Sequence, residues 1–196
     1  MRRAEINRKT NETDIALSLT LDGTGKSEIS TDSGFFHHML TLFASHSRMD
    51  LKLTCDGDSE VDFHHTVEDI GISLGQALVQ GLGDKRGICR YGTFVIPMDE
   101  ALIEVSLDLS GRGLLTENIT LKSQKVGDFD TELCKEFLMA LAREGGITLH
   151  VVQIRGENSH HIIEGIFKAL ARALRIAISI DPQFSEEIPS TKGLLS

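Results

Sequence analysis

Apolar residues recur along this chain with two periods, one of two residues and one near 3.6. Residues 15–21 are apolar at every second position, which predicts a strand with one buried face. Residues 35–46 carry apolar side chains three and four positions apart, which predicts an amphipathic helix. On this basis the first half contains strands at 4–9, 15–21 and 51–55, and helices at 35–46 and from 64 to about 83.

The same order of elements returns in the second half. Strands are expected at 95–98, 102–109 and 147–154, and helices at 131–143 and from 160 onward, until Asp181-Pro182 ends the last helix. A repeat of this size predicts duplication of one strand-strand-helix-strand-helix unit. We therefore expect an α/β fold of the α+β two-layer sandwich type. It would be a single folded unit in which each half packs a four-stranded or smaller sheet on helices, with pseudo-repeats 1–89 and 90–180 and a tail 181–196.

One motif occurs in both halves. Residues 64–68 read His-His-Thr-Val-Glu and residues 160–164 read His-His-Ile-Ile-Glu, so the copies are 96 residues apart. Residues four apart share one face of a helix, whereas sequence neighbours point about 100° apart. The first His and the Glu of each copy can therefore share a cation, while the second His faces elsewhere. If a pseudo-twofold axis relates the helices, two metal sites result, one from His64, Glu68 and His161 and the other from His160, Glu164 and His65.

A single copy of this motif is more often an ordinary polar first turn than a metal site. Two copies at a constant offset, holding four of the eight histidines, favour metal binding. Superposing helix 35–46 on helix 131–143 places His38 opposite Glu136. Each would be an ordinary surface residue if taken alone, but the symmetry makes each a candidate for one further ligand.

Composition narrows the class of protein. The net charge of -9 over 196 residues argues against a general nucleic-acid or anionic-membrane binder, because such partners require a basic surface. No apolar run approaches the roughly 20 residues of a membrane span, and the N-terminus lacks the apolar core of a signal peptide. Three cysteines without paired spacing indicate neither a disulfide framework nor a CxxC zinc site. We expect a cytoplasmic protein.

Cations and hydroxyls near turns form a second group of candidates. The tail segment 188–193 contains Ser190, Thr191 and Lys192 beside a glycine, a combination suited to binding phosphate. On sequence grounds a disordered C-terminal tail is an equally good interpretation. Further cations beside turns or helix starts are Arg90, Arg112 and Lys168.

These motifs together resemble the imidazoleglycerol-phosphate dehydratase family, and the match runs through nearly the whole chain. The segments that carry it are 8–13, 34–40, 62–71, 110–112, 160–174 and 189–193. The resemblance implies an enzyme of histidine biosynthesis that dehydrates D-erythro-imidazole glycerol phosphate to imidazole acetol phosphate. It also implies two Mn(II) ions per active site and a homo-oligomer, typically of 24 subunits, with active sites where subunits meet.

The resemblance also implies roles for individual residues. The ligands of one ion would be His38, His65, His160 and Glu164, and those of the other His64, Glu68 and His161. The remaining ligand of the second ion is commonly a His at the position of Glu136; a Glu can still ligate there, or His150 or water can replace it. Glu164 is the first candidate for proton transfer, with Glu12 and Glu68 after it. The phosphate would be held by Arg90, Arg112, Lys168, Ser190, Thr191 and Lys192, while His46 and Glu12 line the site.

The chemistry gives a reason for two ions. One cation at each ring nitrogen would stabilise an imidazolate, which could expel hydroxide to give a diazafulvene before a base removes the side-chain proton. Because a ligated carboxylate is a weaker base, Glu12 is the better base on physical grounds. The residue types do not select manganese over other divalent metals. Two other classes stay open: a dinuclear metallohydrolase with a bridging carboxylate, and a metal-storage shell, which would have no use for the anion-binding residues.

Overall fold

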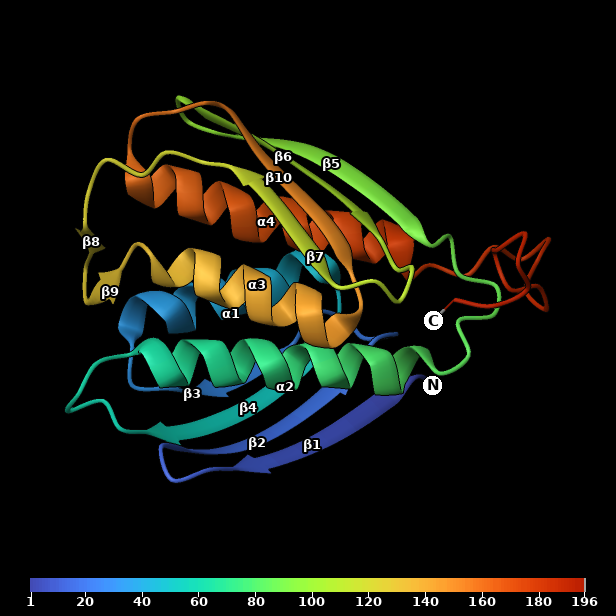
Figure 1. The fold of residues 1–196 in the computed structure, drawn as a ribbon, viewed down its shortest axis with the longest axis horizontal. Coiled ribbons are helices and arrows are strands. Elements are labelled where there is room, and N and C mark those ends of the chain that lie inside the picture. The colour runs from blue at the N-terminus through green and yellow to red at the C-terminus, as the bar shows by residue number, and fades with distance from the viewer. Residues whose placement is uncertain (196) are drawn as a thin grey trace.

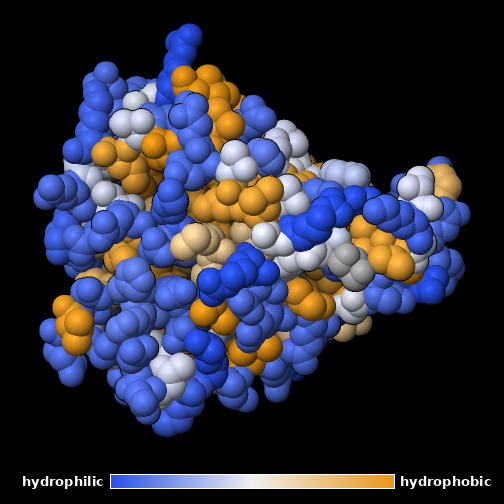
Figure 2. Space-filling view, in the orientation of Figure 1, coloured by the Kyte–Doolittle hydropathy of each residue, from blue (hydrophilic) through white to orange (hydrophobic). Residues whose placement is uncertain are grey.

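The computed structural model describes residues 1–195 and arranges them as four long helices between two four-stranded sheets (Figure 1). Residue 196, the last of the predicted tail, lies outside the described residues. None of the helices in the described part combines the length and the apolar character that crossing a membrane requires. The side seen in Figure 2 is largely hydrophilic, with apolar side chains in separate patches.

Both halves follow the same topology. The first sheet has the order β1-β2-β4-β3 and the second the order β5-β6-β10-β7, and in each the last strand pairs in parallel while the others are antiparallel. This confirms the predicted fold class of two similar halves. The first half comprises β1 (Arg3–Lys9), β2 (Thr13–Thr20), β3 (Ser27–Ser30), α1 (Gly34–Ser47), β4 (Asp50–Gly57) and α2 (His64–Leu82). The second comprises β5 (Tyr91–Met98), β6 (Ala101–Asp108), β7 (Leu114–Asn118), α3 (Leu133–Gly145), β10 (Thr148–Arg155) and α4 (Ser159–Ala177), with a small hairpin of β8 (Lys125–Val126) and β9 (Phe129–Asp130).

The strands β3 and β7 were not predicted from the sequence. Both are edge strands of four or five residues, and each alternates between exposed and half-exposed positions without one fully buried residue. A strand of this kind has no apolar alternation to mark it. Each four-stranded sheet therefore has one strand more than the predicted strand-strand-helix-strand-helix unit, inserted before the first helix, and the second half also has the β8–β9 hairpin there.

The helices join the two halves into one core. Helix α2 packs on β1 and β2, and α4 packs on β5 and β6, whereas the helix pairs α2 with α3 and α1 with α4 each cross from one half to the other. Four buried phenylalanines meet at this crossing, where the rings of Phe137 and Phe167 stack with centroids 5.0 Å apart. Since neither sheet covers its helices without the other half, the chain folds as one unit.

Candidate functional site

The two His-His-x-x-Glu motifs open α2 and α4 at the same end of the molecule, on the left in Figure 1. Each helix start is fixed by a short polar side chain. The Asp62 carboxylate accepts from the backbone N–H of His64 at 2.7 Å, and the Asn158 side chain accepts from that of His160 at 2.9 Å. Such capping satisfies free N–H groups of the first turn and starts the helix there. The histidine pairs therefore stand in the first turns, as predicted.

The Glu164 cluster consists of His38, His160, Glu164 and Lys168. One oxygen of Glu164 lies 3.2 Å from His160 Nε2 and 3.8 Å from His38 Nε2, while its other oxygen lies 2.5 Å from Lys168 Nζ. The Glu164 side chain is only 9% exposed. Burial alone would raise the pKa of this carboxyl, but the bonds from Lys168 and His160 outweigh burial and hold the pKa below its usual value. Glu164 is therefore a buried carboxylate that is ionised at neutral pH.

His46 extends this cluster along the contact between α1 and α4. Its Nδ1 accepts from Arg172 Nε at 3.3 Å. Burial, followed by the charges of Arg172 and Lys168, lowers the pKa of the imidazole below 6.5. The ring is therefore neutral near pH 7, and it lies within a locally cationic region that suits an anionic substrate group.

The Glu12 cluster lies on the first half and consists of Glu12, Asp58, His64, His65 and Glu68. His65 Nε2 is 3.7 Å from Glu12, and His64 Nε2 is 3.9 Å from Glu68. The Asp58 carboxylate lies 2.9 Å from His65 Nδ1, and this bond raises the pKa of His65. A carboxylate on Nδ1 fixes the ring orientation and leaves Nε2 facing the site. Glu68 also contacts Arg143 at 3.6 Å.

His161, like His65, has a carboxylate on its Nδ1 atom, but this carboxylate comes from a different loop. The Glu100 carboxylate in the turn between β5 and β6 lies 2.6 Å from His161 Nδ1, and Asp99 lies 3.5 Å from Nε2. The hydrogen bond with His161, with backbone N–H groups of Asn158 and Glu157, lowers the pKa of Glu100 to about 2. The sequence did not reveal Asp58 or Glu100 as partners, because no fixed spacing relates these loop residues to the histidines.

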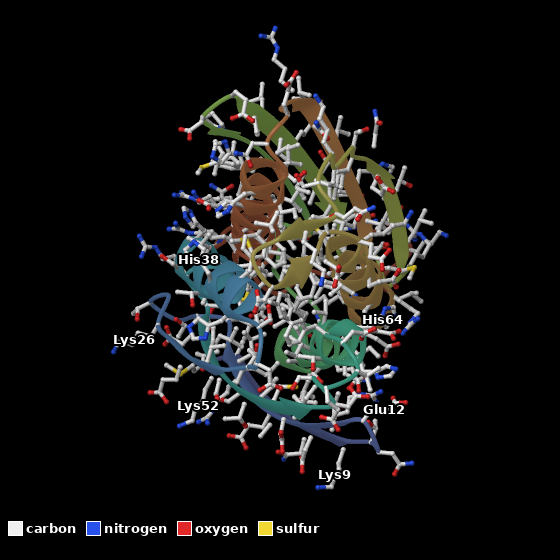
Figure 3. The ribbon with its side chains drawn as sticks, turned by 90° about the vertical axis from the view of Figure 1, so that its left-hand side faces the viewer. Lys9, Glu12, Lys26, His38, Lys52 and His64 are labelled. Atoms are coloured by element: carbon white, nitrogen blue, oxygen red, sulfur yellow. The ribbon has the colours of Figure 1, made fainter. Side chains whose placement is uncertain are left out.

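The Glu164 cluster and the Glu12 cluster lie on opposite flanks of this end of the chain. Figure 3 shows His38 on one flank and His64 with Glu12 on the other. Of the first predicted ligand set, His38, His160 and Glu164 come together, but His65 stands beside Glu12 instead. Of the second set, His64 and Glu68 are close, while the contacts of His161 are with Asp99 and Glu100. One chain thus presents parts of each set.

Glu136 and His150 were the alternatives for the last ligand. Glu136 lies half-buried in the first turn of α3, and its side chain makes no hydrogen bond or ion pair within residues 1–195. His150 is exposed on β10, between two strand residues that face the core. Its side chain therefore points to the side of the sheet away from the helices. Glu136 therefore lies on the helical layer, whereas His150 lies on the outer face of its sheet.

The donor atoms suit a divalent metal ion, although one chain does not complete a site. Imidazole nitrogens and carboxylate oxygens are usual ligands for such ions, and ligands about 2.1 Å from one ion lie roughly 3 Å or more from each other. The His–Glu separations of 3.2 to 3.9 Å are close to that spacing. Within residues 1–195, however, no group of three or more His, Cys, Asp or Glu side chains has the arrangement of a metal site.

The predicted phosphate ligands are also divided. Lys168 belongs to the Glu164 cluster, but Arg90 donates to both oxygens of Asp108, at 2.7 and 3.0 Å, and Arg112 lies 3.6 Å from the same carboxylate. Arg90 also donates to the carbonyl oxygen of Pro189 at 2.9 Å, which ties down the loop carrying Ser190, Thr191 and Lys192. This loop lies at the far end of the molecule from the helix starts (Figure 1).

The tail is ordered along the segment before β5. Gly87 donates to the carbonyl of Glu187 at 2.8 Å and accepts from the N–H of Asp181 at 2.7 Å. The Arg86 side chain donates to the carbonyl of Glu186 at 2.7 Å. Together with the bond from Arg90 to Pro189, these contacts hold residues 181–189 against the body. Phosphate binding by Ser190, Thr191 and Lys192 stays a prediction.

The fold is a duplicated α/β unit, and its helix starts and turns carry histidines, carboxylates and cations. These features define the class of protein as an enzyme with acid–base and ligand-binding side chains on both halves. Comparison with known proteins narrows the class. The family model "Imidazoleglycerol-phosphate dehydratase" matches residues 31–174. Relatives of that name from Cereibacter sphaeroides and Xanthobacter autotrophicus are 57% and 55% identical over 195 residues, covering 100% of this chain and 100% and 99% of theirs.

Solved structures agree with the sequence relatives. Imidazoleglycerol-phosphate dehydratase from Staphylococcus aureus superposes with a TM-score of 0.83 at 44% identity, covering 91% of this chain and 99% of its own. The enzyme from Pyrococcus furiosus superposes with a TM-score of 0.84 at 39% identity, covering 97% and 100%. The chain belongs to the imidazoleglycerol-phosphate dehydratase family, the hydro-lyases that carry out a dehydration in histidine biosynthesis.

Proposed function

We propose that this chain converts D-erythro-imidazole glycerol phosphate to imidazole acetol phosphate in a reaction that depends on two Mn(II) ions per active site. The Glu164 cluster is the observation that carries the proposal. It holds a buried, ionised carboxylate between two histidines and an ammonium group, so that metal-ligand, proton-transfer and anion-binding side chains are adjacent. Neither a hydrolase with a bridging carboxylate nor a storage shell requires that combination.

The proposed metal ligands follow the family pattern. One ion would be held by His38, His65, His160 and Glu164, and the other by His64, Glu68, His161 and Glu136. The contacts of Asp58 with His65 and of Glu100 with His161 support these roles, because each leaves an Nε2 atom facing the site. When bound, the two ions would stabilise negative charge on the substrate ring and so favour loss of hydroxide from the carbon attached to it.

We propose further that active sites are completed between copies of the chain. The first ligand set draws on both clusters, and the second joins His64 and Glu68 of the Glu12 cluster to His161, the neighbour of His160 on α4. The two clusters lie on opposite flanks of one chain. Two chains that bring the Glu164 cluster of one against the Glu12 cluster of the other would unite each set. The same arrangement would bring the tail loop of a further copy to the substrate phosphate. A homo-oligomer follows from this proposal, and 24 subunits is the number that the family resemblance implies.

Proton transfer is assigned first to Glu164. Dehydration removes hydroxide from the carbon next to the ring and a proton from the following carbon, and the resulting enol becomes the ketone with water as the other product. Glu164 is ionised and can accept that proton, although its low pKa makes it a weak base. Glu12 is 52% exposed and 3.7 Å from His65, so it can reach a substrate diol from the opposite side. Glu68 is the third candidate.

The phosphate does not react, so its binding groups serve orientation. Lys168 would contact it from the Glu164 cluster with His46 nearby, and Arg90, Arg112, Ser190, Thr191 and Lys192 would contact it from the tail region. Such contacts away from the reacting carbon hold the ring in register with the groups that transfer protons. The shared Asp108 supports a joint role for Arg90 and Arg112, because it keeps both guanidinium groups beside the loop.

The test is turnover by metal-stripped protein. Imidazole acetol phosphate should form from imidazole glycerol phosphate only after Mn(II) is added, with two ions bound per active site. Tight stoichiometric binding without turnover would overturn the dehydratase assignment and favour a hydrolase or a storage shell. The variant Lys192→Ala further distinguishes a dehydratase from a metal-storage shell. This variant should raise KM with little change in metal content, whereas the matched exposed-lysine variant Lys26→Ala should leave KM unchanged.

A further inference from the structure

The Glu12 side chain is too exposed to be held in place by packing against its neighbours. Its side chain is 52% exposed, and it stands in the connection of residues 10–12 between β1 and β2. A carboxylate that transfers a proton must be held within a fraction of an ångström of its working position. The fixed point therefore has to lie in the backbone of this loop.

Two threonine hydroxyls brace that backbone. The Thr10 hydroxyl accepts from the N–H of Glu12 at 3.0 Å and from the N–H of Thr13 at 2.9 Å. The Thr13 hydroxyl lies 3.3 Å from that of Thr10. On the other side of the loop, the N–H of Asp58 donates to the carbonyl of Glu12 at 3.0 Å. Both backbone polar groups of Glu12 are thus satisfied, which fixes the peptide planes on either side of it.

The brace is anchored on α2 by a buried carboxylate. Asp69, whose side chain is 9% exposed, accepts from the Thr13 hydroxyl at 2.5 Å with one oxygen and from Arg8 at 2.8 Å with the other. Asp69 follows Glu68 directly on the helix that also carries His65. The loop that carries Glu12 is therefore attached to α2, the helix that also carries His65 and Glu68. Charge-assisted bonds of this kind are among the strongest that a side chain makes.

The second half has no equivalent. The position 96 residues after Asp69 is Gly165, where an added Cβ would meet Ile103 at 2.8 Å. The matching connection between β5 and β6 contains only Asp99 and Glu100, and the Glu100 carboxylate is occupied by His161 and by backbone N–H groups at the start of α4. The hydrogen bonds that connect α2 to the loop between β1 and β2 are thus specific to the half that carries Glu12.

We infer that Asp69, acting through the hydroxyls of Thr13 and Thr10, is a positioning residue that sets the working place of Glu12. This inference rests on the proposed function, because it takes Glu12 to act on the substrate diol. It assigns to the Arg8-Asp69-Thr13 network a role in the reaction in addition to its contribution to folding. If the inference is correct, removing these hydrogen bonds lowers kcat only in an enzyme that still has the Glu12 carboxylate.

The experiment is a double-mutant cycle on the Mn(II)-loaded enzyme. Thr13→Val keeps the shape of the side chain and removes the hydroxyl, and should lower kcat by about 10- to 100-fold with little change in KM, because a displacement near 1 Å has an effect of that size. Thr13→Ser restores the hydroxyl and should restore kcat. In a Glu12→Gln background, Thr13→Val should change kcat by less than about twofold. Equal losses of kcat in both backgrounds would overturn the inference.

A second readout does not depend on turnover. In metal-free protein, amide hydrogen exchange at Glu12 should accelerate in Thr13→Val and in Thr10→Val, and remain at the wild-type rate in Thr13→Ser. If Thr13→Val fails to fold, Thr10→Val carries the cycle, because that hydroxyl is only half-buried and binds the Glu12 amide directly. An unchanged exchange rate in both valine variants would contradict the brace. Wild-type protein without dehydratase activity but with this exchange pattern would remove the proposed function and leave the brace as a structural fact.

Discussion

Helix α2 of the first half and the equivalent helix α4 of the second half both begin beside carboxylates, but only α4 carries lysine and arginine side chains of its own. Around α2 stand Asp58 and Asp69. Along α4 stand Lys168 and Arg172, at positions where α2 has Ile72 and Gln76. The duplicated His-His-x-x-Glu motif is common to both. The two halves thus share the ligand pattern, but the second half adds two cations along its helix where the first half has an isoleucine and a glutamine.

The two halves also pack their helices differently. Helix α2 approaches α3 through Gly71 and Gly75, where an added Cβ would meet backbone or side-chain atoms of α3 at 2.9 Å and 2.7 Å. The equivalent positions on α4 are Phe167 and Ala171, and Phe167 stacks on Phe137. Helix α2 thus approaches α3 closely at its glycines, whereas α4 has a large aromatic side chain at the first of these positions, which also packs edge-on against Phe36 of α1.

The largest expected effect distinguishes the two motif glutamates. Glu164→Gln should lower kcat by about 10²- to 10⁴-fold, the range for loss of a general acid or base. Metal content, measured by elemental analysis, separates proton transfer from ligand loss. A kcat within tenfold of wild type would contradict the role of Glu164. A much larger loss in Glu68→Gln at unchanged metal content would reverse the roles assigned to the two glutamates.

The ion pair of Lys168 and Glu164 should matter for stability. Both side chains are largely buried, at 17% and 9% exposure, so Lys168→Met leaves a buried carboxylate without its partner. We expect the free energy of unfolding, measured in urea, to fall by about 2 to 3 kcal/mol. Lys135→Met removes a partner of Glu117 at a largely exposed position and should cost less than about 1 kcal/mol. Equal costs for the two variants would contradict the account of Lys168 and Glu164 as a buried pair.

The glycine contact of α2 gives a smaller effect. Gly71→Ala must displace Ala140 or the carbonyl of Phe137, which lies 3.0 Å from the added Cβ, and should destabilise the protein by about 1 to 2 kcal/mol. Gly34→Ala is the control, since the nearest atom to its added Cβ is 3.9 Å away, and should stay within about 0.5 kcal/mol of wild type. Urea denaturation measures both, and an unchanged midpoint for Gly71→Ala would show that α2 and α3 can separate freely.

The smallest effect concerns the pH response of His46. Its pKa is lowered by burial and then by Arg172, so the unfolded chain takes up this proton more readily than the folded one. The stability contributed by neutral His46 is therefore complete above about pH 6.5 and is lost as pH falls through and below that value. NMR titration should give a pKa below 6.5 in wild type and a higher one in Arg172→Gln. A titration unaffected by Arg172→Gln would contradict the contact.

The sequence predicted well what repeats within the chain. The predicted helix 35–46 is found at Gly34–Ser47 and the predicted strand 147–154 at Thr148–Arg155, because both elements bury a continuous apolar face. The histidine pairs stand at helix starts, as the 96-residue offset indicated. The strands β3 and β7 were not predicted because edge strands with half-exposed side chains show no apolar alternation in the sequence.

Contacts between distant loops could not be predicted from spacing. Asp58 reaches His65 from the loop after β4, Glu100 reaches His161 across 61 residues, and Arg90 reaches Pro189 across 99. None of these pairs has an offset that secondary structure imposes. The same holds for the order of the tail, which depends on hydrogen bonds with Gly87 and Arg86. Tertiary folding, not local pattern, brings these residues together.

The proposed pairing of the Glu164 cluster of one chain with the Glu12 cluster of another implies that neither cluster works without the other. Complementation tests this most directly. Glu164→Gln and Glu12→Gln chains, each with a strongly reduced kcat alone, are co-expressed and purified together as mixed oligomers carrying different affinity tags. Random mixing should restore about one quarter of wild-type activity, because one pairing in four joins an intact Glu164 cluster to an intact Glu12 cluster. Mixed oligomers with no more activity than either variant alone would contradict the account, since they would mean that each active site belongs to a single chain.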